Sequence, residues 1–370
     1  RGGQDALNVL VPHGNKKYRE LRPTIAVPGP GEEGTPFLKL DATFGFHPSL
    51  KALLPFWESK QLACVVNCGS PHETRSHFDA QDFMEYAAPG LRTMKAGWLN
   101  RFLEGTKAAK KDDREFTIRA LAMQGLLPRS LRGPFPVLAV PDKNVLNNEK
   151  VLDTFDGLYG EKKGDMEKRS DDPVVAAGQD TLDTLKHYRE AVEKRRKERK
   201  TSYPAGALGS KLQDVASVLH ADVGLEVACM DVGGWDHHAN EGGDEGTIAT
   251  MLENVGDGLA AFAQDIGDRL ASTLIVVMTE FGRTCRENGN RGTDHSHGGL
   301  MMLLGGAVKG GKVHGRWTGL EDKDLYQSRD LPVTTDFRDV FHDILRSHLA
   351  WEAPKEFFPD CRPTGVKGLF

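Results

Sequence analysis

The sequence has no long apolar run, few cysteines and no large excess of charge of either sign. None of its apolar runs reaches the roughly 18 residues that a membrane-spanning helix needs, so no membrane span is expected. The net charge of -5 over 370 residues gives no strong field for binding nucleic acid or an anionic membrane surface. Five cysteines without a C-x-x-C pair argue against a zinc ribbon and a disulfide framework. These absences leave a chain long enough for a large hydrophobic core.

Sequence patterns typical of buried strands alternate with patterns typical of amphipathic helices along this chain. Short apolar runs typical of buried strands lie at residues 62–66, 225–230, 273–278 and 300–304. Helical patterns lie between and around them, at residues 49–58, 78–86, 97–103, 208–219, 251–266 and 337–349. The alternation predicts an α/β fold with a large, mainly parallel central sheet flanked by helices on both faces.

Residues 159–203 differ in composition from the rest of the chain, being rich in lysine, arginine, glutamate and aspartate. We interpret this stretch as a charged helical insertion within one domain that spans residues 1–370. Its basic run at residues 194–200 is either a solvated helix face or a binding patch, and a solvated face is the more common outcome for such runs.

Polar residues gather where three of the predicted strands end. They occupy residues 68–77, 231–240 and 280–297. In parallel α/β sheets, ligand-binding groups lie on the loops beyond the carboxyl ends of the strands. We therefore expect these three loops to share one site.

Two of these loops carry aspartate and histidine at the spacing of metal ligands. The candidate ligands are Asp236, His238, Asp294, His295 and His297. A mixture of carboxylate oxygen and imidazole nitrogen suits a divalent metal. The alternative for the Asp294 and His295 pair is a structural hydrogen bond, and His297 is as well suited to support a ligand as to be one. The donor types do not separate zinc from manganese or iron.

Ser76 and two arginines are the candidates for the chemistry itself. Ser76 precedes a predicted helix and has Asp79 three residues later, a pattern that fits either a helix cap or a nucleophile beside a bound anion. Arg283 follows a strand that ends in Glu280, and these two either form a salt bridge or hold an oxyanion with the guanidinium. Arg75 is the second candidate for that role.

The motifs taken together resemble the domain-of-unknown-function 1501 family of bacterial proteins, which is grouped with the alkaline phosphatase and sulfatase superfamily. The matching segments are residues 1–8 (RGGQDALN), 74–81 (TRSHFDAQ), 231–238 (DVGGWDHH), 279–284 (TEFGRT), 292–299 (GTDHSHGG) and 305–311 (GGAVKGG). The sequence departs from the sulfatases of this superfamily, whose signature is C-x-P-x-R or S-x-P-x-R. Residues 68–75 read CGSPHETR, so the proline comes one position and the arginine three positions too late after the cysteine. The formylglycine chemistry of sulfatases is therefore not expected.

The resemblance implies two divalent metal ions with a nucleophile between them. Zinc is the first candidate, with manganese or calcium as alternatives. By the same resemblance, one ion is held by Asp5, Ser76, Asp294 and His295, and the other by Asp236 and His238, with His297 as a further candidate.

These features predict a metal-dependent hydrolase of small anionic substrates, either phosphate esters or related sulfate and phosphonate esters. Ser76 is the expected nucleophile, while Arg283 or Arg75 steadies the remaining oxygens of the ester. The alternative is an exported metal-binding or scaffolding protein whose site is not catalytic. Family members often begin with a twin-arginine export signal, so the resemblance implies a periplasmic or secreted protein, and the start at Arg1 fits a missing upstream segment.

Overall fold

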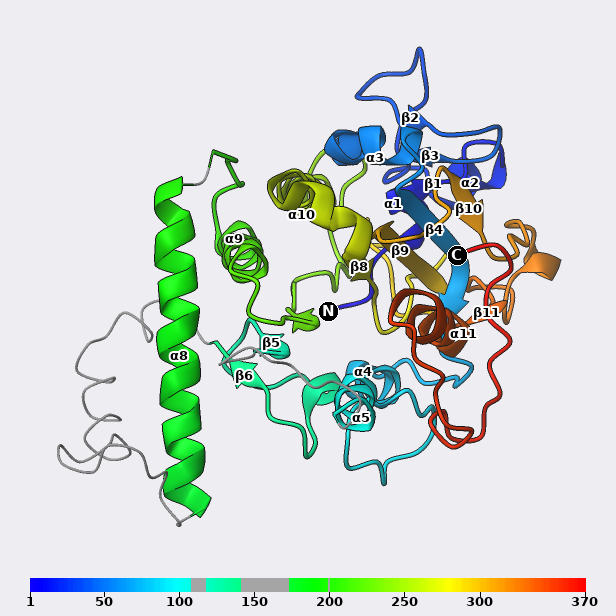
Figure 1. The fold of residues 1–370 in the computed structure, drawn as a ribbon. Coiled ribbons are helices and arrows are strands. Elements are labelled where there is room, and N and C mark those ends of the chain that lie inside the picture. Colours follow the sequence, from blue (N-terminus) through cyan, green and yellow to red (C-terminus); the bar gives the residue numbers. More distant parts are fainter. Residues whose placement is uncertain (108–117, 141–172, 199) are drawn as a thin grey trace, which may run out of the picture. The chain divides into compact units, whose positions relative to one another are not determined.

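The computed structural model describes residues 1–107, 118–140, 173–198 and 200–370 (Figure 1). The chain divides into two compact units. The first unit comprises residues 1–94, 202–209 and 232–370, and the second comprises residues 95–201 and 210–231. A single domain over residues 1–370 stays a prediction.

The core of the first unit is a mixed sheet built on two buried strands. Strand β4 (Leu62–Gly69) pairs antiparallel with β9 (Gly299–Gly305), and every residue of both is buried. Strand β8 (Leu274–Val277) pairs antiparallel with the other edge of β9, while β10 (Lys312–His314) and β11 (Thr335–Asp336) run parallel to β4 (Figure 1). The apolar runs of β4 and β9 form the interior because both of their faces are covered.

A smaller antiparallel sheet and several helices complete the first unit. The small sheet has the order β1-β3-β2, with β1 at Leu10–Val11, β2 at Leu38–Lys39 and β3 at Gly45–Phe46. The α-helices are α1 (Ala6–Val9), α2 (Lys17–Leu21), α3 (Leu54–Glu58), α4 (His77–Tyr86), α10 (Thr247–Ile266) and α11 (Phe337–Asp343). The apolar face of α10 packs against the 3₁₀ helix at Pro48–Leu53.

The second unit contains a small parallel sheet and three described α-helices. Strand β5 (Ala120–Ala122) lies between β6 (Leu138–Ala139) and β7 (Val227–Cys229), and both neighbours run parallel to it. The helices are α5 (Trp98–Gly105), α8 (Pro173–Glu198) and α9 (Ala207–His220), of which α9 begins in the chain segment of the first unit. The four predicted strands and the six predicted helices are found at their expected positions, although the first helix begins as a 3₁₀ helix and the last one ends as a π-helix.

The prediction of a large, mainly parallel central sheet was wrong. Among the described residues, the strands form three small sheets, and the largest is mixed, with β9 antiparallel to both of its neighbours. The reason lies in residues 278–298, which connect β8 to β9 without a helix. Parallel neighbours need a long crossover, usually helical, whereas a chain that turns back directly gives antiparallel pairing.

The charged stretch that the sequence predicts as an insertion is described only in part. Residues 159–172 lie outside the described residues, and residues 173–198 form α8. This helix is amphipathic rather than polar all round, since Leu182 and Tyr188 are buried and the Tyr188 hydroxyl donates to Asp214. In the part of the chain that the structure describes, we find no helix with both the length and the apolar character needed to span a bilayer.

Candidate metal centre

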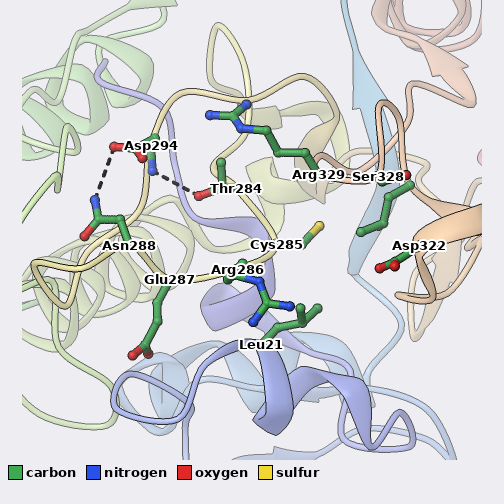
Figure 2. A pocket seen from close by; sticks show the side chains of 11 residues that line it. Leu21, Thr284, Cys285, Arg286, Glu287, Asn288, Asp294, Asp322, Ser328 and Arg329 are labelled. Carbon is green, nitrogen blue, oxygen red and sulfur yellow. Dashed lines mark hydrogen bonds between the residues drawn. The ribbon is translucent and has the colours of Figure 1, made fainter.

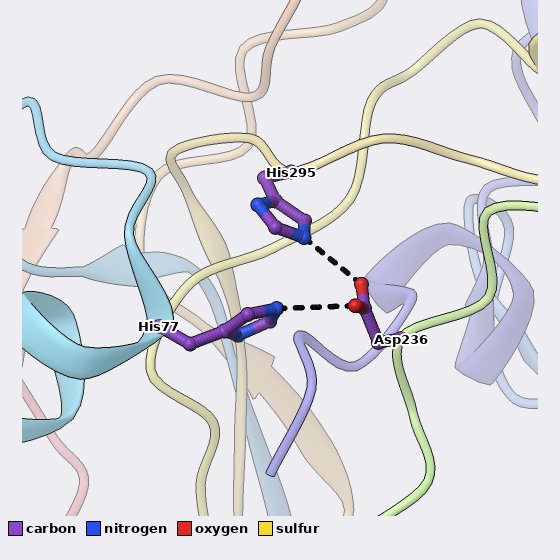
Figure 3. A group of neighbouring side chains, drawn as sticks. All are labelled: His77, Asp236 and His295. Carbon is purple, nitrogen blue, oxygen red and sulfur yellow. Dashed lines mark hydrogen bonds and ion pairs between the residues drawn. The ribbon is translucent and has the colours of Figure 1, made fainter.

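Three separate segments of the first unit bring imidazole and carboxylate groups together (Figure 3). The start of α4 supplies His77, the loop after residue 231 supplies Asp236, and the β8–β9 loop supplies His295. Their ligand atoms, one from each side chain, all lie within 4.8 Å of one another. The Nε2 atom of His238 lies 3.0 Å from Asp236 Oδ1 and 3.0 Å from His295 Nε2. We call these four residues the Asp236 centre.

A buried arginine holds Asp236 in position. Arg283 donates from Nη1 to Asp236 Oδ1 over 2.7 Å, and its other N–H groups donate to Thr293 and to the Gly2 carbonyl. Burial would raise the pKa of Asp236, but the hydrogen bond and the positive charge of Arg283 act against this effect, and the pKa is lowered to about 2. Asp236 is therefore a carboxylate at neutral pH.

A buried carboxylate fixes the outer nitrogen of His77. The Nδ1 atom of His77 donates to Glu280 Oε1 over 2.8 Å, and the same oxygen accepts the Gly2 N–H at 2.8 Å. In the neutral ring the proton is therefore on Nδ1, and Nε2 carries a lone pair. This Nε2 atom is buried, lies 3.4 Å from Asp236 Oδ2 and has no hydrogen-bond partner among the described residues.

The other two histidines are oriented in the same way. His295 donates from Nδ1 to the backbone carbonyl of Arg75 over 2.9 Å, and His238 donates from Nδ1 to Asp294 Oδ1 over 2.8 Å. Burial would raise the pKa of Asp294, but hydrogen bonds from His238 and Asn288 outweigh it and lower the pKa. Each ring thus presents its Nε2 atom to the inside of the Asp236 centre.

This donor set fits a divalent cation. Three Nε2 lone pairs and a carboxylate face one another, and acceptors at such short distances repel unless a positive charge lies between them. Histidines that bind metals usually donate their other nitrogen to a carboxylate or a backbone carbonyl, as all three do here. Imidazole nitrogen together with carboxylate oxygen is a typical zinc ligand set.

Ser76 and Arg75 adjoin the Asp236 centre through the backbone. Ser76 lies between Arg75, whose carbonyl accepts from His295, and His77. The Ser76 side chain is exposed and makes no cap hydrogen bond at the start of α4, so the capping pattern with Asp79 is not used. The Arg75 guanidinium donates to the buried carboxylate of Asp330 at 2.7 Å.

Three of the expected ligands, Asp5, Asp294 and His297, lie outside the Asp236 centre, and Asp294 accepts from the outer nitrogen of His238. Asp5 is fully buried in a two-point ion pair with Arg22, at distances of 2.5 and 2.8 Å. The His297 ring stacks on Tyr326 with 4.6 Å between ring centroids, and burial lowers the pKa of His297. Asp5 and His297 therefore have structural contacts of their own.

The sequence agrees along most of its length with one known family. The sequence model of DUF1501, described as a protein of unknown function, matches residues 1–350. The chain belongs to the DUF1501 family. Comparisons with curated proteins and with solved structures gave no match. The matched region of this DUF1501 chain contains the whole Asp236 centre.

Sequence reasoning missed three residues that organise this region of the DUF1501 chain. They are His77, Glu280 as its hydrogen-bond partner, and Arg22. His77 directly follows Ser76, so the polar segment before the predicted helix was the available signal for both residues. Glu280 and Arg283 were expected either to form a salt bridge or to hold an oxyanion with the guanidinium, whereas Glu280 accepts from His77 and Arg283 donates to Asp236.

The buried pair of Asp5 and Arg22 gives a test of the role of Asp5 in the DUF1501 chain. Asp5→Asn leaves the Arg22 charge buried without its partner, so we expect a loss of about 3 kcal/mol of stability, measured by urea denaturation. Metal affinity should change little, because Asp5 belongs to the ion pair. In the double variant Asp5→Leu, Arg22→Met we expect much of the stability to return. A stable Asp5→Asn protein with strongly weakened metal binding would instead make Asp5 a ligand.

Proposed function

We propose that this DUF1501 chain is a metal-dependent hydrolase of phosphate esters or of the related sulfate and phosphonate esters. The observation that carries the proposal is the convergence of three histidine Nε2 atoms on the Asp236 carboxylate, with each outer nitrogen already held by an acceptor. When bound, a divalent ion supplies Lewis acidity and lowers the pKa of an adjacent hydroxyl or water.

The ligand types favour zinc, with manganese or calcium as weaker candidates. His77, His238 and His295 would bind the ion through Nε2, and Asp236 through its carboxylate. Calcium prefers oxygen ligands, so a site with three imidazoles suits it less well. The family resemblance implies two ions, and the number of ions per chain is a quantity that elemental analysis measures directly.

Ser76 is the proposed nucleophile. Its two neighbours are both tied to the Asp236 centre, and its hydroxyl makes no hydrogen bond to the described residues. The first N–H groups of α4, which receive no side-chain cap, favour negative charge beside it. In the proposed reaction the Ser76 hydroxyl gives up its proton and its oxygen forms a bond to phosphorus or sulfur, while the bond to the leaving-group oxygen breaks and that oxygen takes up a proton. Water then hydrolyses the ester formed on Ser76 and restores the hydroxyl.

The two arginines take different parts in this proposal. Arg283 is a positioning residue, because its guanidinium is buried and holds the Asp236 carboxylate. Arg75 is partly exposed and directly precedes Ser76 in the chain. It is the proposed contact for the other oxygens of the ester, which it would bind with N–H groups that remain beside its ion pair with Asp330. The chemistry proposed here follows the alkaline phosphatase and sulfatase superfamily, without its sheet architecture.

A direct assay tests the proposal. Protein purified without added metal is analysed for bound elements and then incubated with phenyl phosphate, a diaryl phosphate and an aryl sulfate, with zinc, manganese or calcium added. We expect turnover of at least one ester that a chelator abolishes and that returning the ion restores. Bound metal without turnover of any ester would favour the non-catalytic alternative, and a protein that binds no metal would contradict both.

Metal binding is also expected to stabilise the fold. An ion that binds only the folded chain adds about 2.7 kcal/mol when its free concentration is 100 times Kd. We therefore expect the Tm to rise by several degrees when zinc is added to chelator-treated protein, as measured by calorimetry. Magnesium, which prefers oxygen ligands, serves as the control and is expected to have little effect. An equal rise with both ions would argue against a histidine-rich site.

A further inference from the structure

A cavity of about 230 Å³ in the first unit adjoins residues that contact the Asp236 centre (Figure 2). Two of its lining residues also hold histidines of that centre. Asp294 accepts from His238 Nδ1 at 2.8 Å, and Arg329 donates to the backbone carbonyl of His295 at 3.0 Å. The cavity is therefore separated from the histidines of the centre by the side chains of Asp294 and Arg329, and an ester bound at the centre would reach it with its organic part.

The charged side chains around the cavity are mostly committed to other contacts. Glu287 accepts from the Thr24 hydroxyl and from backbone N–H groups, and Arg329 is paired with Asp330 at 2.7 Å. Arg286 differs, because its side chain is exposed and has no hydrogen-bond or ion-pair partner among the described residues. Figure 2 shows its guanidinium among the lining side chains. The cavity thus offers one uncommitted guanidinium to a ligand.

We propose that this cavity binds the organic part of the ester and that Arg286 recognises a second negative charge on it, most simply a carboxylate. This inference rests on the proposed function, since it names the class of substrate for the same site. A cavity of about 150 Å³ admits benzene, so the space here suits one ring or a short chain rather than a macromolecule. A planar guanidinium matches a carboxylate in two-point contact.

The cavity also contains an uncommitted negative charge. Asp322 lines it and has no hydrogen-bond or ion-pair partner for its side chain among the described residues. Its carboxylate would repel an anionic group, so the second charge of the substrate is expected to point toward Arg286 and away from Asp322. Removing the charge of Arg286 is therefore expected to weaken the binding of an anionic ligand, and removing the charge of Asp322 is not.

Binding of non-hydrolysable analogues tests the inference without turnover. Calorimetry compares phenylphosphonate with 4-carboxyphenylphosphonate on the zinc-loaded protein. We expect the carboxylated analogue to bind about fivefold to tenfold more tightly, and Arg286→Gln to remove that preference. Asp322→Asn should keep or increase the preference, and Arg269→Gln, an exposed arginine outside the cavity, should leave it unchanged.

The outcomes separate this inference from the proposed function. Equal binding of the two analogues, no binding of either, or a preference that persists in Arg286→Gln overturns the inference. If phenyl phosphate is hydrolysed in that case, the proposed function still stands. A preference that depends on Arg286, in a protein that hydrolyses no ester, would keep the cavity as a binding site and contradict the hydrolase.

Discussion

Replacing Ser76 with alanine is expected to lower the rate of ester hydrolysis by a factor of about 10³ to 10⁶, the range that loss of a serine nucleophile causes in other hydrolases. The hydroxyl is exposed at the start of α4 and makes no cap hydrogen bond, so its loss removes no contact of the fold. Bound metal and Tm should therefore stay unchanged. Initial rates with the best ester substrate, together with metal content per chain, measure both effects.

An exposed serine elsewhere in the same unit is the matched control. Ser272 ends a 3₁₀ helix that carries no residue of the Asp236 centre, so Ser272→Ala should keep the full rate. If Ser76→Ala also kept the full rate with metal bound, water rather than Ser76 would be the nucleophile. A loss of metal from Ser76→Ala would make the hydroxyl a ligand in the first place.

Asp236→Asn is expected to weaken metal binding by more than about 100-fold. Even hydrogen-bond partners of metal ligands typically contribute 10-fold to 100-fold, and Asp236 supplies the only carboxylate among the four residues of the centre. The substitution also leaves the buried Arg283 without its charged partner. Competition with a coloured chelator measures the affinity, and hydrolysis should fall with it.

Two further variants calibrate this result. Glu280→Gln changes only the acceptor that orients His77, so its effect on metal affinity should be smaller, about tenfold to 100-fold. Asp257→Asn, an exposed carboxylate on α10, should have no effect. Unchanged affinity in Asp236→Asn would place the ion elsewhere and remove the basis for the proposed function.

The positions of four strands, β4, β7, β8 and β9, could be predicted, but their directions could not. Apolar runs such as those of β4 and β9 report burial on both faces, and burial is the same for parallel and antiparallel neighbours. Direction depends on the connection, and the helix-free segment at residues 278–298 turns the chain back from β8 to β9. The glycine-rich, polar character of that segment was the available signal for antiparallel pairing.

Part of the candidate site also followed from sequence spacing. Asp236, His238 and His295 were expected to meet because each follows an apolar strand, and they lie within hydrogen-bond distance of one another. The ion pair of Asp5 could not be predicted, because its partner Arg22 comes from a helix end with no recognisable pattern. A buried ion pair and a metal ligand use the same residue types, and only the fold separates them.

The Asp236 centre draws its side chains from distant parts of the chain. His77 and its partner Glu280 are 203 positions apart, and Asp236 and His295 are 59 apart. During folding, contacts between such distant residues are expected to form late, because the entropy lost on closing a long loop must be offset by contacts formed elsewhere. Metal uptake by a refolding chain is therefore expected to lag behind the recovery of helical circular dichroism, so the arrival of the ion would mark the completion of the first unit.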